Sequence, residues 1–179
     1  FNGPARLALD GTDLYVSDAF NHTIRRVTSA GEVSTVAGQP GVSGYVDGPA
    51  PAARFNGPTG ILRTPSGEVL VAEWWGHFIR KVSTNGQVST FAGLSASAGF
   101  ANGTGTEARF QNPSGVWVCN TGGVAVVDRT HTLRHITSSG VTTTLAGAAW
   151  LGGTNDGVGT VARFRTPVAL AGSADGTLF

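Results

Sequence analysis

The tetrapeptide Phe1-Asn2-Gly3-Pro4 returns three times along the chain, at spacings of 54, 55 and 54 residues. Its later copies are Phe55-Asn56-Gly57-Pro58, Phe110-Gln111-Asn112-Pro113 and Phe164-Arg165-Thr166-Pro167. Five further landmarks keep the same step: His22, His77 and His131; Arg25, Arg80 and Arg134; Ala37-Gly38, Ala92-Gly93 and Ala146-Gly147; Asp47-Gly48, Asn102-Gly103 and Asp156-Gly157; Ala53-Arg54, Ala108-Arg109 and Ala162-Arg163. A period of this length indicates supersecondary units that stack on one another.

Each unit contains the pattern of four short β-strands. In the second unit we expect strands at residues 60–63, 69–72, 78–82 and 88–91, followed by a Gly-, Ala- and Ser-rich loop that runs to residue 107. The middle strands are apolar on both faces, which suits a sheet packed between two neighbours. Four-stranded antiparallel sheets repeated radially form a β-propeller, so the sequence predicts an all-β fold of that type.

The whole chain, residues 1–179, is expected to form part of one propeller domain. Its blades would cover about 1–54, 55–109 and 110–163, and a further blade would start at 164–179. Three units and the start of a fourth do not close a ring, because propellers have about four to eight blades. Further blades of the same chain, or another subunit, would complete the ring, and we favour the first alternative.

The heptapeptide Asn21-His22-Thr23-Ile24-Arg25-Arg26-Val27, with Gly-Glu-Val-Ser-Thr-Val-Ala-Gly at 31–38, resembles the NHL repeat of β-propeller blades. The second unit matches at 77–82 and 86–93, although Gly76 replaces the Asn. The third unit departs further, since it is one residue shorter between Asp128 and His131. The similarity covers essentially the entire chain. It implies a propeller, commonly of six blades.

The long Asp-Gly loop ending in Ala-Arg-Phe is similar to blades of secreted or cell-surface NHL proteins such as teneurins. Related propellers also include enzymes, because some bind metals at the axis and act as lyases or hydrolases. Other NHL proteins inside cells bind RNA. The resemblance therefore implies a fold more firmly than a function.

Composition narrows the classes of partner. The chain has 27 Gly, 13% charged residues and a net charge of +1, with its 11 Arg and single Lys spread along the sequence. We therefore predict no nucleic-acid partner, since that requires a clustered basic face. No apolar run approaches the ~20 residues of a membrane span, so direct membrane insertion is not expected. Cys119 alone forms no internal disulfide.

In an up-and-down blade, the turns between the second and third strands lie on the same face as the long loops. Long loops held on a rigid frame are common binding sites. Tryptophan and arginine are enriched at protein contact hot spots. The protein-binding candidates on this face are Phe20, Trp74, Trp75, Arg129 and Trp150. The alternative for Phe20 and Trp75 is that they cover the top of the blade by packing on the following loop.

An acidic residue and an arginine recur together in every unit. The pairs are Asp18 with Arg25, Glu73 with Arg80, and Asp128 with Arg134. An acid at a turn can accept backbone N–H groups, and arginine can donate to the acid or to loop carbonyls. A pair repeated once per blade is interpreted as structural. We expect Arg54, Arg109 and Arg163 to hold the loop turns at Asp47, Asn102 and Asp156.

No metal site or cofactor is predicted. His22, His77 and His131 are each one blade apart, and no pair of ligands has metal-binding spacing. No nucleophile triad, phosphate loop or dinucleotide fingerprint is present. Arg6 stands where the other units have Gly60, Gly115 and Ala169, so it is an anion-binding candidate, or it fills space left by a smaller neighbour.

Two tripeptides match the N-glycosylation pattern, at Asn21 and Asn102, of which Asn102 is expected to be more accessible. The composition does not assign a compartment, although low charge and a single Lys favour an extracellular or cell-surface setting. The leading hypothesis is a non-catalytic propeller scaffold that presents a rigid surface to a protein partner. The alternative is a propeller enzyme, a metal-dependent lyase or hydrolase, with an axial site in the complete ring.

Overall fold

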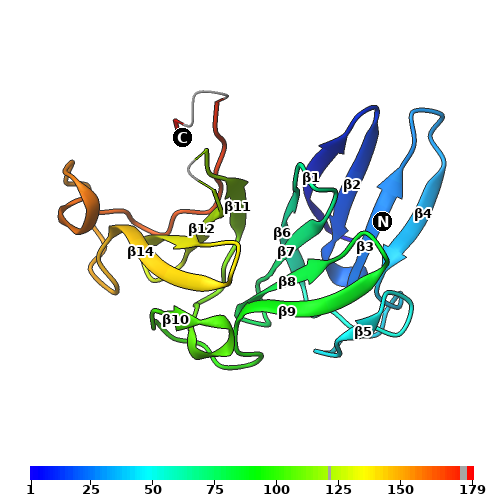
Figure 1. The fold of residues 1–179 in the computed structure, drawn as a ribbon, viewed down its shortest axis with the longest axis horizontal. Coiled ribbons are helices and arrows are strands. Elements are labelled where there is room, and N and C mark those ends of the chain that lie inside the picture. Colours follow the sequence, from blue (N-terminus) through cyan, green and yellow to red (C-terminus); the bar gives the residue numbers. More distant parts are fainter. Residues whose placement is uncertain (121, 174–176) are drawn as a thin grey trace.

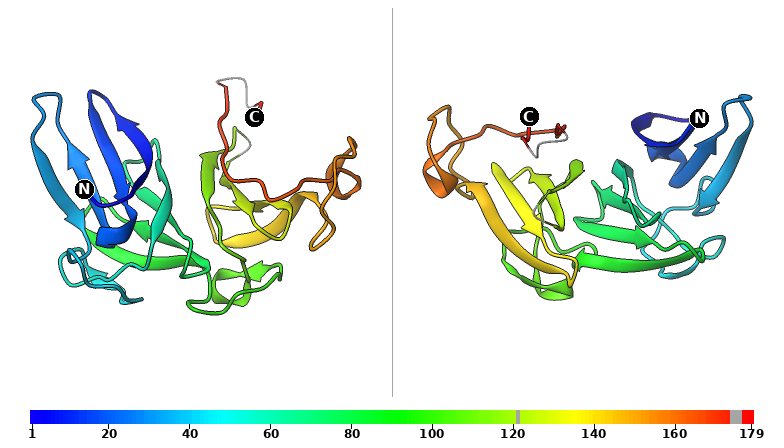
Figure 2. Two further views of the ribbon diagram at one scale, coloured as in Figure 1. Left: turned by 180° about the vertical axis from the view of Figure 1, so that it is seen from behind. Right: turned by 45° about the horizontal axis from the view of Figure 1, so that its top comes forward.

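The computed structural model describes residues 1–120, 122–173 and 177–179. Its strands form three antiparallel sheets, which follow one another along an arc that does not close (Figures 1 and 2). The first sheet consists of β1 (Pro4–Asp10), β2 (Asp13–Asp18), β3 (Thr23–Val27) and β4 (Val33–Ala37). Consecutive strands pair in the order β1-β2-β3-β4, the expected meander.

The second and third sheets repeat this meander. The second contains β6 (Pro58–Arg63), β7 (Val69–Glu73), β8 (Phe78–Val82) and β9 (Gln87–Gly93). The third contains β11 (Gly115–Val118), β12 (Val124–Asp128), β13 (Thr132–Ile136) and β14 (Val141–Gly147). Three short 3-10 turns are η1 (Ala19–Asn21), η2 (Gly105–Glu107) and η3 (Gly159–Val161).

The expectation of four strands per blade is wrong for the second and third sheets, which have five strands. Each gains a two-residue strand from the long loop that precedes it: β5 (Gly48–Pro49) pairs with β9, and β10 (Gly103–Thr104) pairs with β14. The reason is that the loop leaving one unit returns along the outer edge of the next sheet, where unpaired backbone groups of the last strand are available. The first sheet has no such strand.

Among described residues 164–173 and 177–179, the structure shows no strand and one isolated bridge, between Gly172 and Leu178. The expected inner strand of a fourth blade is therefore not formed as part of a sheet, since a strand needs a paired neighbour to build a ladder. The segment still runs beside β11. A Cβ on Gly115 would lie 2.9 Å from the Leu170 nitrogen.

The hydrophobic core lies between sheets. One cluster joins Ile24 of the first sheet to Ile61 and Val71 of the second. A second cluster joins Leu70 and Ile79 of the second sheet to Val116 and Val126 of the third. Burial on both faces of the middle strands explains why those strands are apolar throughout.

The repeated Phe fits the repeated Ala-Gly of the preceding unit. Phe55 and Phe110 are fully buried. A Cβ on Gly38 would lie 3.0 Å from the Phe55 ring, and a Cβ on Gly93 would lie 2.9 Å from the Phe110 ring. Both glycines also have left-handed φ values, of +90° and +93°, that side chains rarely adopt. The two landmarks keep step because each Phe packs on the glycine at the end of the previous sheet.

Among the described residues, no helix is long and apolar enough to span a bilayer.

Candidate functional site

Two of the predicted contact residues stack across the boundary between the first and second units. The rings of Phe20, in η1, and Trp75, in the β7–β8 turn, lie 5.8 Å apart with an interplanar angle of 17°. Each ring also covers the glycine of its own unit's tetrapeptide, because a Cβ would lie 2.4 Å from Phe20 at Gly3 and 2.2 Å from Trp75 at Gly57. Both side chains nevertheless remain exposed, at 54% for Phe20 and 41% for Trp75.

A second contact continues this surface into the third unit. The Arg129 guanidinium lies 5.4 Å from the centre of the Trp74 ring, a cation–π geometry. The Asn112 side-chain amide donates a hydrogen bond to the Trp74 carbonyl at 2.8 Å, which fixes the backbone beneath the pair. We refer to Phe20, Trp75, Trp74 and Arg129 as the aromatic strip. The strip crosses all three units.

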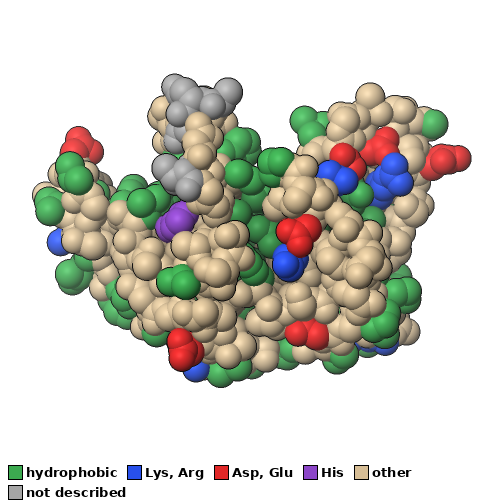
Figure 3. Space-filling model, in the orientation of Figure 1, with side chains coloured by type: hydrophobic (Ala, Val, Ile, Leu, Met, Phe, Trp, Pro, Cys, Tyr) green, Lys and Arg blue, Asp and Glu red, His purple; other side chains and the backbone are tan. Residues whose placement is uncertain are grey.

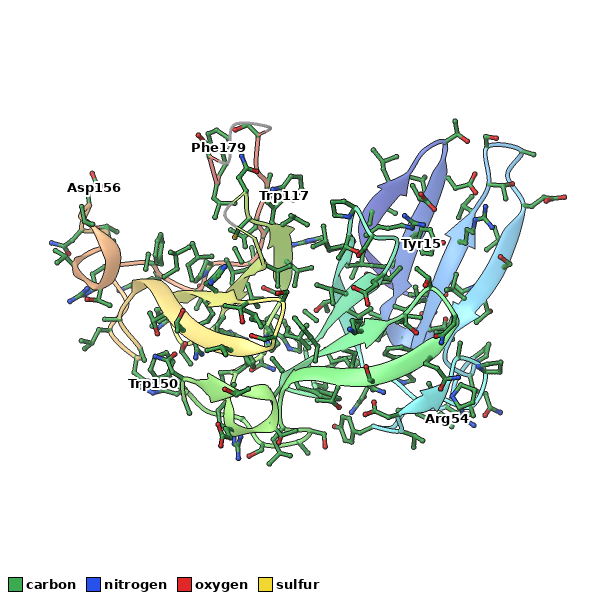
Figure 4. The ribbon with its side chains drawn as sticks, in the orientation of Figure 1. Tyr15, Arg54, Trp117, Trp150, Asp156 and Phe179 are labelled. Atoms are coloured by element: carbon green, nitrogen blue, oxygen red, sulfur yellow. The ribbon has the colours of Figure 1, made fainter. Side chains whose placement is uncertain are left out.

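Trp150 is exposed at 58% and is not part of the recorded strip contacts. It lies in the loop after β14, and Figure 4 shows it far across the molecule from Arg54. Its backbone N–H donates to the Thr130 carbonyl at 2.9 Å. The structure thus brings four of the five predicted contact residues together.

The acid–arginine pairs form ion pairs beneath this face. Glu73 and Arg80 are fully buried and lie 2.9 Å apart, while Asp128 and Arg134 are fully buried at 3.4 Å. Each acid also accepts a backbone N–H from its own tetrapeptide, as Glu73 does from Asn56 at 2.7 Å. Burial raises the pKa of Glu73 to about 8 and that of Asp128 to about 6, although the neighbouring arginines oppose this shift. Burial also lowers the pKa of Arg134.

The same arginines hold the preceding long loops. Arg80 donates to the Val46 carbonyl at 2.9 Å, the Arg54 carbonyl at 3.1 Å and the Asp47 carboxylate at 2.5 Å. Arg134 donates in the same way to the Ala101 carbonyl at 2.8 Å, the Asn102 side-chain oxygen at 2.8 Å and the Arg109 carbonyl at 3.1 Å.

We expected Arg54, Arg109 and Arg163 to hold the loop turns at Asp47, Asn102 and Asp156, but the recorded arginine bonds to the Asp47 and Asn102 side chains come from Arg80 and Arg134. The hydrogen bonds recorded for the three expected arginines go to nearby backbone carbonyls, as from Arg54 to Ala52 at 2.6 Å and from Arg163 to Thr160 at 2.6 Å. These arginines lie at most three residues from the carbonyls that they bind. Their side chains therefore close a local bend and do not extend across the loop. Arg80 and Arg134 reach it from β8 and β13.

The repeated histidines join consecutive units. Nδ1 of His22, His77 and His131 accepts a backbone N–H of the next unit at 3.3, 3.1 and 3.0 Å, respectively. The donors are Gly57, Asn112 and Thr166, each 35 residues farther along. All three histidines have left-handed φ values, which turn the ring toward the following unit. Burial lowers the pKa of His22 and His77, which favours the neutral ring that such an acceptor requires.

A groove of about 710 Å³ runs along the inner strands β1, β6 and β11. Figure 3 shows hydrophobic side chains gathered in the hollow at the centre of the arc. Arg6 lines this groove and reaches the C-terminal segment, where it donates to the Val168 carbonyl at 3.2 Å. Trp117 lines the groove as well and lies beside that segment near Phe179 (Figure 4). Within the described ranges, no three His, Cys, Asp or Glu residues are grouped to hold a metal.

The two sequons differ in their hydrogen bonds. The Asn21 side-chain nitrogen, where a glycan would be attached, donates to the buried Asp18 carboxylate at 2.8 Å. Asn102 instead uses its side-chain oxygen, as the acceptor for Arg134, and its residue is exposed. Asn102 is therefore the more accessible of the two candidate glycosylation sites.

No family model and no curated protein sequence matches the chain. Solved structures do. A Bacteroides thetaiotaomicron protein of unknown function matches with a TM-score of 0.76 and 24% identity over 93% of this chain and 41% of that one. An auxiliary nutrient binding protein of Bacteroides ovatus matches with a TM-score of 0.73 and 23% identity, over 95% of this chain and 43% of that one.

Two other matches are more distant. Virginiamycin B lyase of Staphylococcus aureus has a TM-score of 0.60 and 15% identity, over 98% of this chain and 47% of the lyase. A nidogen/laminin complex has a TM-score of 0.62 and 16% identity, over 96% of this chain and 52% of that one. The chain thus spans about half or less of each protein. These likenesses show an all-β fold of β-propeller-like type.

Sequence reasoning missed the histidine bonds, and it did not identify which loop carbonyls Arg80 and Arg134 bind. In all three units the residue whose N–H binds the histidine lies 35 residues after that histidine. The first two units carry an aromatic residue at positions 20 and 75 and a glycine at positions 3 and 57, whereas the third unit has Thr130 and Asn112. This difference matches the structure, in which each ring covers the glycine of its own unit. Backbone donors carry no side-chain label, so the sequence alone does not reveal the bonds.

Proposed function

We propose that the chain is part of an NHL-type β-propeller that serves as a non-catalytic scaffold and binds a protein partner through the aromatic strip. The observation that supports this most directly is the arrangement of Phe20 on Trp75 and Arg129 on Trp74. These side chains are held by contacts between units. Large rings fixed in advance bind with little loss of side-chain entropy.

The strip has the chemistry of a protein-binding hot spot. Phe20 and Trp75 offer exposed apolar ring surface, and Arg129 adds a guanidinium beside it. Aromatic residues and arginine dominate the energetics of such interfaces. The nutrient-binding and nidogen/laminin neighbours make a binding role consistent with the fold. Trp150 would add a second contact at the far end of the same face.

The experiment is capture of a partner from the secreted fraction of the source cells, identified by mass spectrometry. The double variant Phe20→Ala/Trp74→Ala is compared with wild type, after circular dichroism has shown equal folding. Leu145→Ala is the matched control, because Leu145 is an exposed apolar residue on β14. A partner retained by the control and lost by the double variant supports the proposal. A partner retained by both rejects the strip as its site.

A second candidate is a ligand or catalytic site at the axis, as in the propeller enzymes considered above. Arg6 favours an anion there, because its guanidinium lies in the apolar groove with only two of its donors in recorded hydrogen bonds. Inorganic phosphate and acetate are suitable probes, titrated against wild type and Arg6→Met by calorimetry. Elemental analysis of the purified protein tests the metal-dependent form, and a stoichiometric metal would favour the enzyme over the scaffold.

We further propose an extracellular or cell-surface setting with a glycan on Asn102, supported by the exposure of Asn102 and the low charge of the chain. Peptide mapping of the protein from its native source tests both points. A glycan on Asn102 and an unmodified Asn21 would support them. Cytosolic recovery with both residues unmodified would contradict them.

A further inference from the structure

We propose that a cavity between the second and third sheets binds a free hydrophobic α-amino acid. The cavity has a volume of about 220 Å³ and is lined by the β6–β7, β11–β12 and β13–β14 turns and by residues of β7, β8, β9 and β12. These turns lie at the opposite ends of the strands from the aromatic strip. Among the described residues, only the second and third units contribute to the lining. The cavity adjoins the groove of the inner strands at Pro65 and Val118.

In the equivalent place between the first and second sheets, an arginine side chain occupies the space. The Arg63 guanidinium lies 5.7 Å from the centre of the Tyr15 ring. Its Nε lies 3.0 Å from the Asp10 carboxylate, so that an ion pair crosses the boundary between the two units. Both partners of the ion pair are largely buried, with side chains 25% and 31% exposed. A ring, a guanidinium and a carboxylate therefore fill the first joint at this level.

The second joint, between the second and third sheets, has a smaller side chain at each of these three positions. The strand registers give the equivalent residues, which are Val118 for Arg63, Leu70 for Tyr15 and Thr64 for Asp10. All three smaller residues line the cavity. The cavity is therefore the space that the arginine and the ring fill one unit earlier. It results from three substitutions within otherwise equivalent joints.

The inner wall of the cavity is apolar. Leu70 and Val124 are 3% and 4% exposed, and Phe91 packs against the same core cluster. At about 30 Å³ per water molecule in the liquid, the cavity has the volume of roughly seven waters. Pockets that enclose drug-sized ligands are larger, about 300–1,000 Å³. The cavity therefore suits one small apolar side chain, such as that of leucine.

One charge of each sign borders this apolar wall. The Lys81 ammonium lies 5.9 Å from the centre of the Phe91 ring and 3.1 Å from the Glu68 carboxylate, and both charged side chains are 32% exposed. The Ser66 hydroxyl also donates to Glu68, at 3.4 Å. An ammonium has three donors and a carboxylate about four acceptor positions, so each group retains capacity for a ligand. A partly exposed ion pair contributes little, so a ligand that separates the two groups loses little.

A zwitterion fits these two charges better than a simple ion does. A ligand with only a carboxylate would bind Lys81 but meet the like charge of Glu68, and an amine would bind Glu68 but meet Lys81. The α-carboxylate and α-ammonium groups of an amino acid pair with both residues, while its side chain enters the apolar cavity. A terminal residue of a peptide carries only one of the two charges. The chemistry therefore identifies the ligand as a free amino acid.

NMR titration of the chain with L-leucine, glycine and 4-methylpentanoate tests this assignment. Leucine is expected to bind at least about tenfold more tightly than glycine, because its aliphatic side chain is buried on binding. It should also bind more tightly than 4-methylpentanoate, which is leucine without the ammonium group. Leucine that does not saturate the site, or that binds no better than glycine, would overturn the proposal. A carboxylate that binds as tightly as leucine would overturn the zwitterion.

Two variants test the location. Thr64→Asp/Val118→Arg rebuilds the ion pair of the first joint inside the cavity, so the variant should lose leucine binding; retained binding would overturn the proposed site. Lys81→Met leaves the cavity open and should weaken leucine binding about two- to fivefold, the value of an exposed ion pair. Arg26→Met is the matched control, because Arg26 pairs with Asp13 at the same place in the first unit and should not affect binding. Equal effects of Lys81→Met and Arg26→Met would overturn the role of Lys81.

Discussion

Replacing Arg80 by Met tests the role of the buried arginines. Met has a similar length and no donors, so Arg80→Met removes the hydrogen bonds to Glu73, Asp47 and the carbonyls of Val46 and Arg54. The Glu73 carboxyl is left buried with only its backbone donor. Breaking a buried pair in this way costs about 3–5 kcal/mol of the free energy of unfolding. That is a large share of the ~5–15 kcal/mol typical of a folded protein.

Arg25→Met is the matched control, because Arg25 occupies the same position in the first unit. It loses one ion pair at 3.5 Å and one hydrogen bond at 3.4 Å, and its side chain is partly exposed. Asp18 is buried but keeps the Asn2 N–H and the Asn21 amide as donors, so we expect a smaller loss than for Arg80→Met, of about 0.5–1.5 kcal/mol, the net value of one hydrogen bond. Equilibrium urea unfolding of both variants, at constant pH and with m-values compared, measures the difference. Equal losses, or a larger loss for Arg25→Met, would refute the idea that the loop contacts stabilise the joint.

Three further predictions follow from individual contacts. His77→Asn keeps a residue that tolerates the left-handed φ of +63° and removes the titrating ring. Because burial lowers the pKa of His77 below 6.5, wild type is expected to lose stability as pH falls through the lowered value, and the variant to lose less; identical pH profiles would contradict this. For Glu73 the sign is opposite, since its pKa is raised from 4.5 to about 8: wild type should lose stability as pH rises through this window, whereas Glu73→Gln should show a flatter profile in the same unfolding experiment. Gly93→Ala should lower the stability in thermal unfolding clearly more than Gly86→Ala. Both residues have positive φ, so each alanine adds roughly 1–2 kcal/mol of strain, but only at Gly93 would the new Cβ lie within 2.9 Å of Phe78 and Phe110. Equal losses of stability would count against the packing of Phe110 on Gly93.

The fold class could be predicted from the sequence because its signals are periodic. Phe55 and Gly38 recur in step, and the structure shows that one packs on the other. The pairing of Glu73 with Arg80 was also accessible, since an acid at the end of one strand and an arginine in the next strand recur six or seven residues apart in every unit. Side chains that recur once per unit can be recognised from the sequence alone.

Contacts to the backbone could not be predicted in the same way. The bonds from Arg80 to the Val46 and Arg54 carbonyls use acceptors that every residue possesses. The two-residue strand β5 carries a Gly and a Pro, residues that strands disfavour, so it has no strand signature. It forms because the loop is held against the edge of β9. Tertiary contacts determine this element, and local preference does not indicate it.

The aromatic strip was likewise predicted only in part from the sequence. The sequence placed Phe20, Trp74, Trp75 and Arg129 on one face, but it did not pair them. The structure pairs Phe20 with Trp75 and Trp74 with Arg129, each across a boundary between units. Equivalent turns of neighbouring blades lie side by side, and the side chains that fill them differ from unit to unit. The choice of partner therefore depends on blade spacing, which a repeat pattern does not contain.

Native-state hydrogen exchange of three backbone amides tests most directly whether consecutive units share one kind of joint. Gly57 and Asn112 donate to His22 and His77, whereas Gly3, at the same place in the first unit, has no recorded acceptor among the described residues. Slow exchange at Gly57 and Asn112, both lost on replacing the matching histidine, together with fast exchange at Gly3, is the predicted result. Equal exchange at all three amides would contradict it.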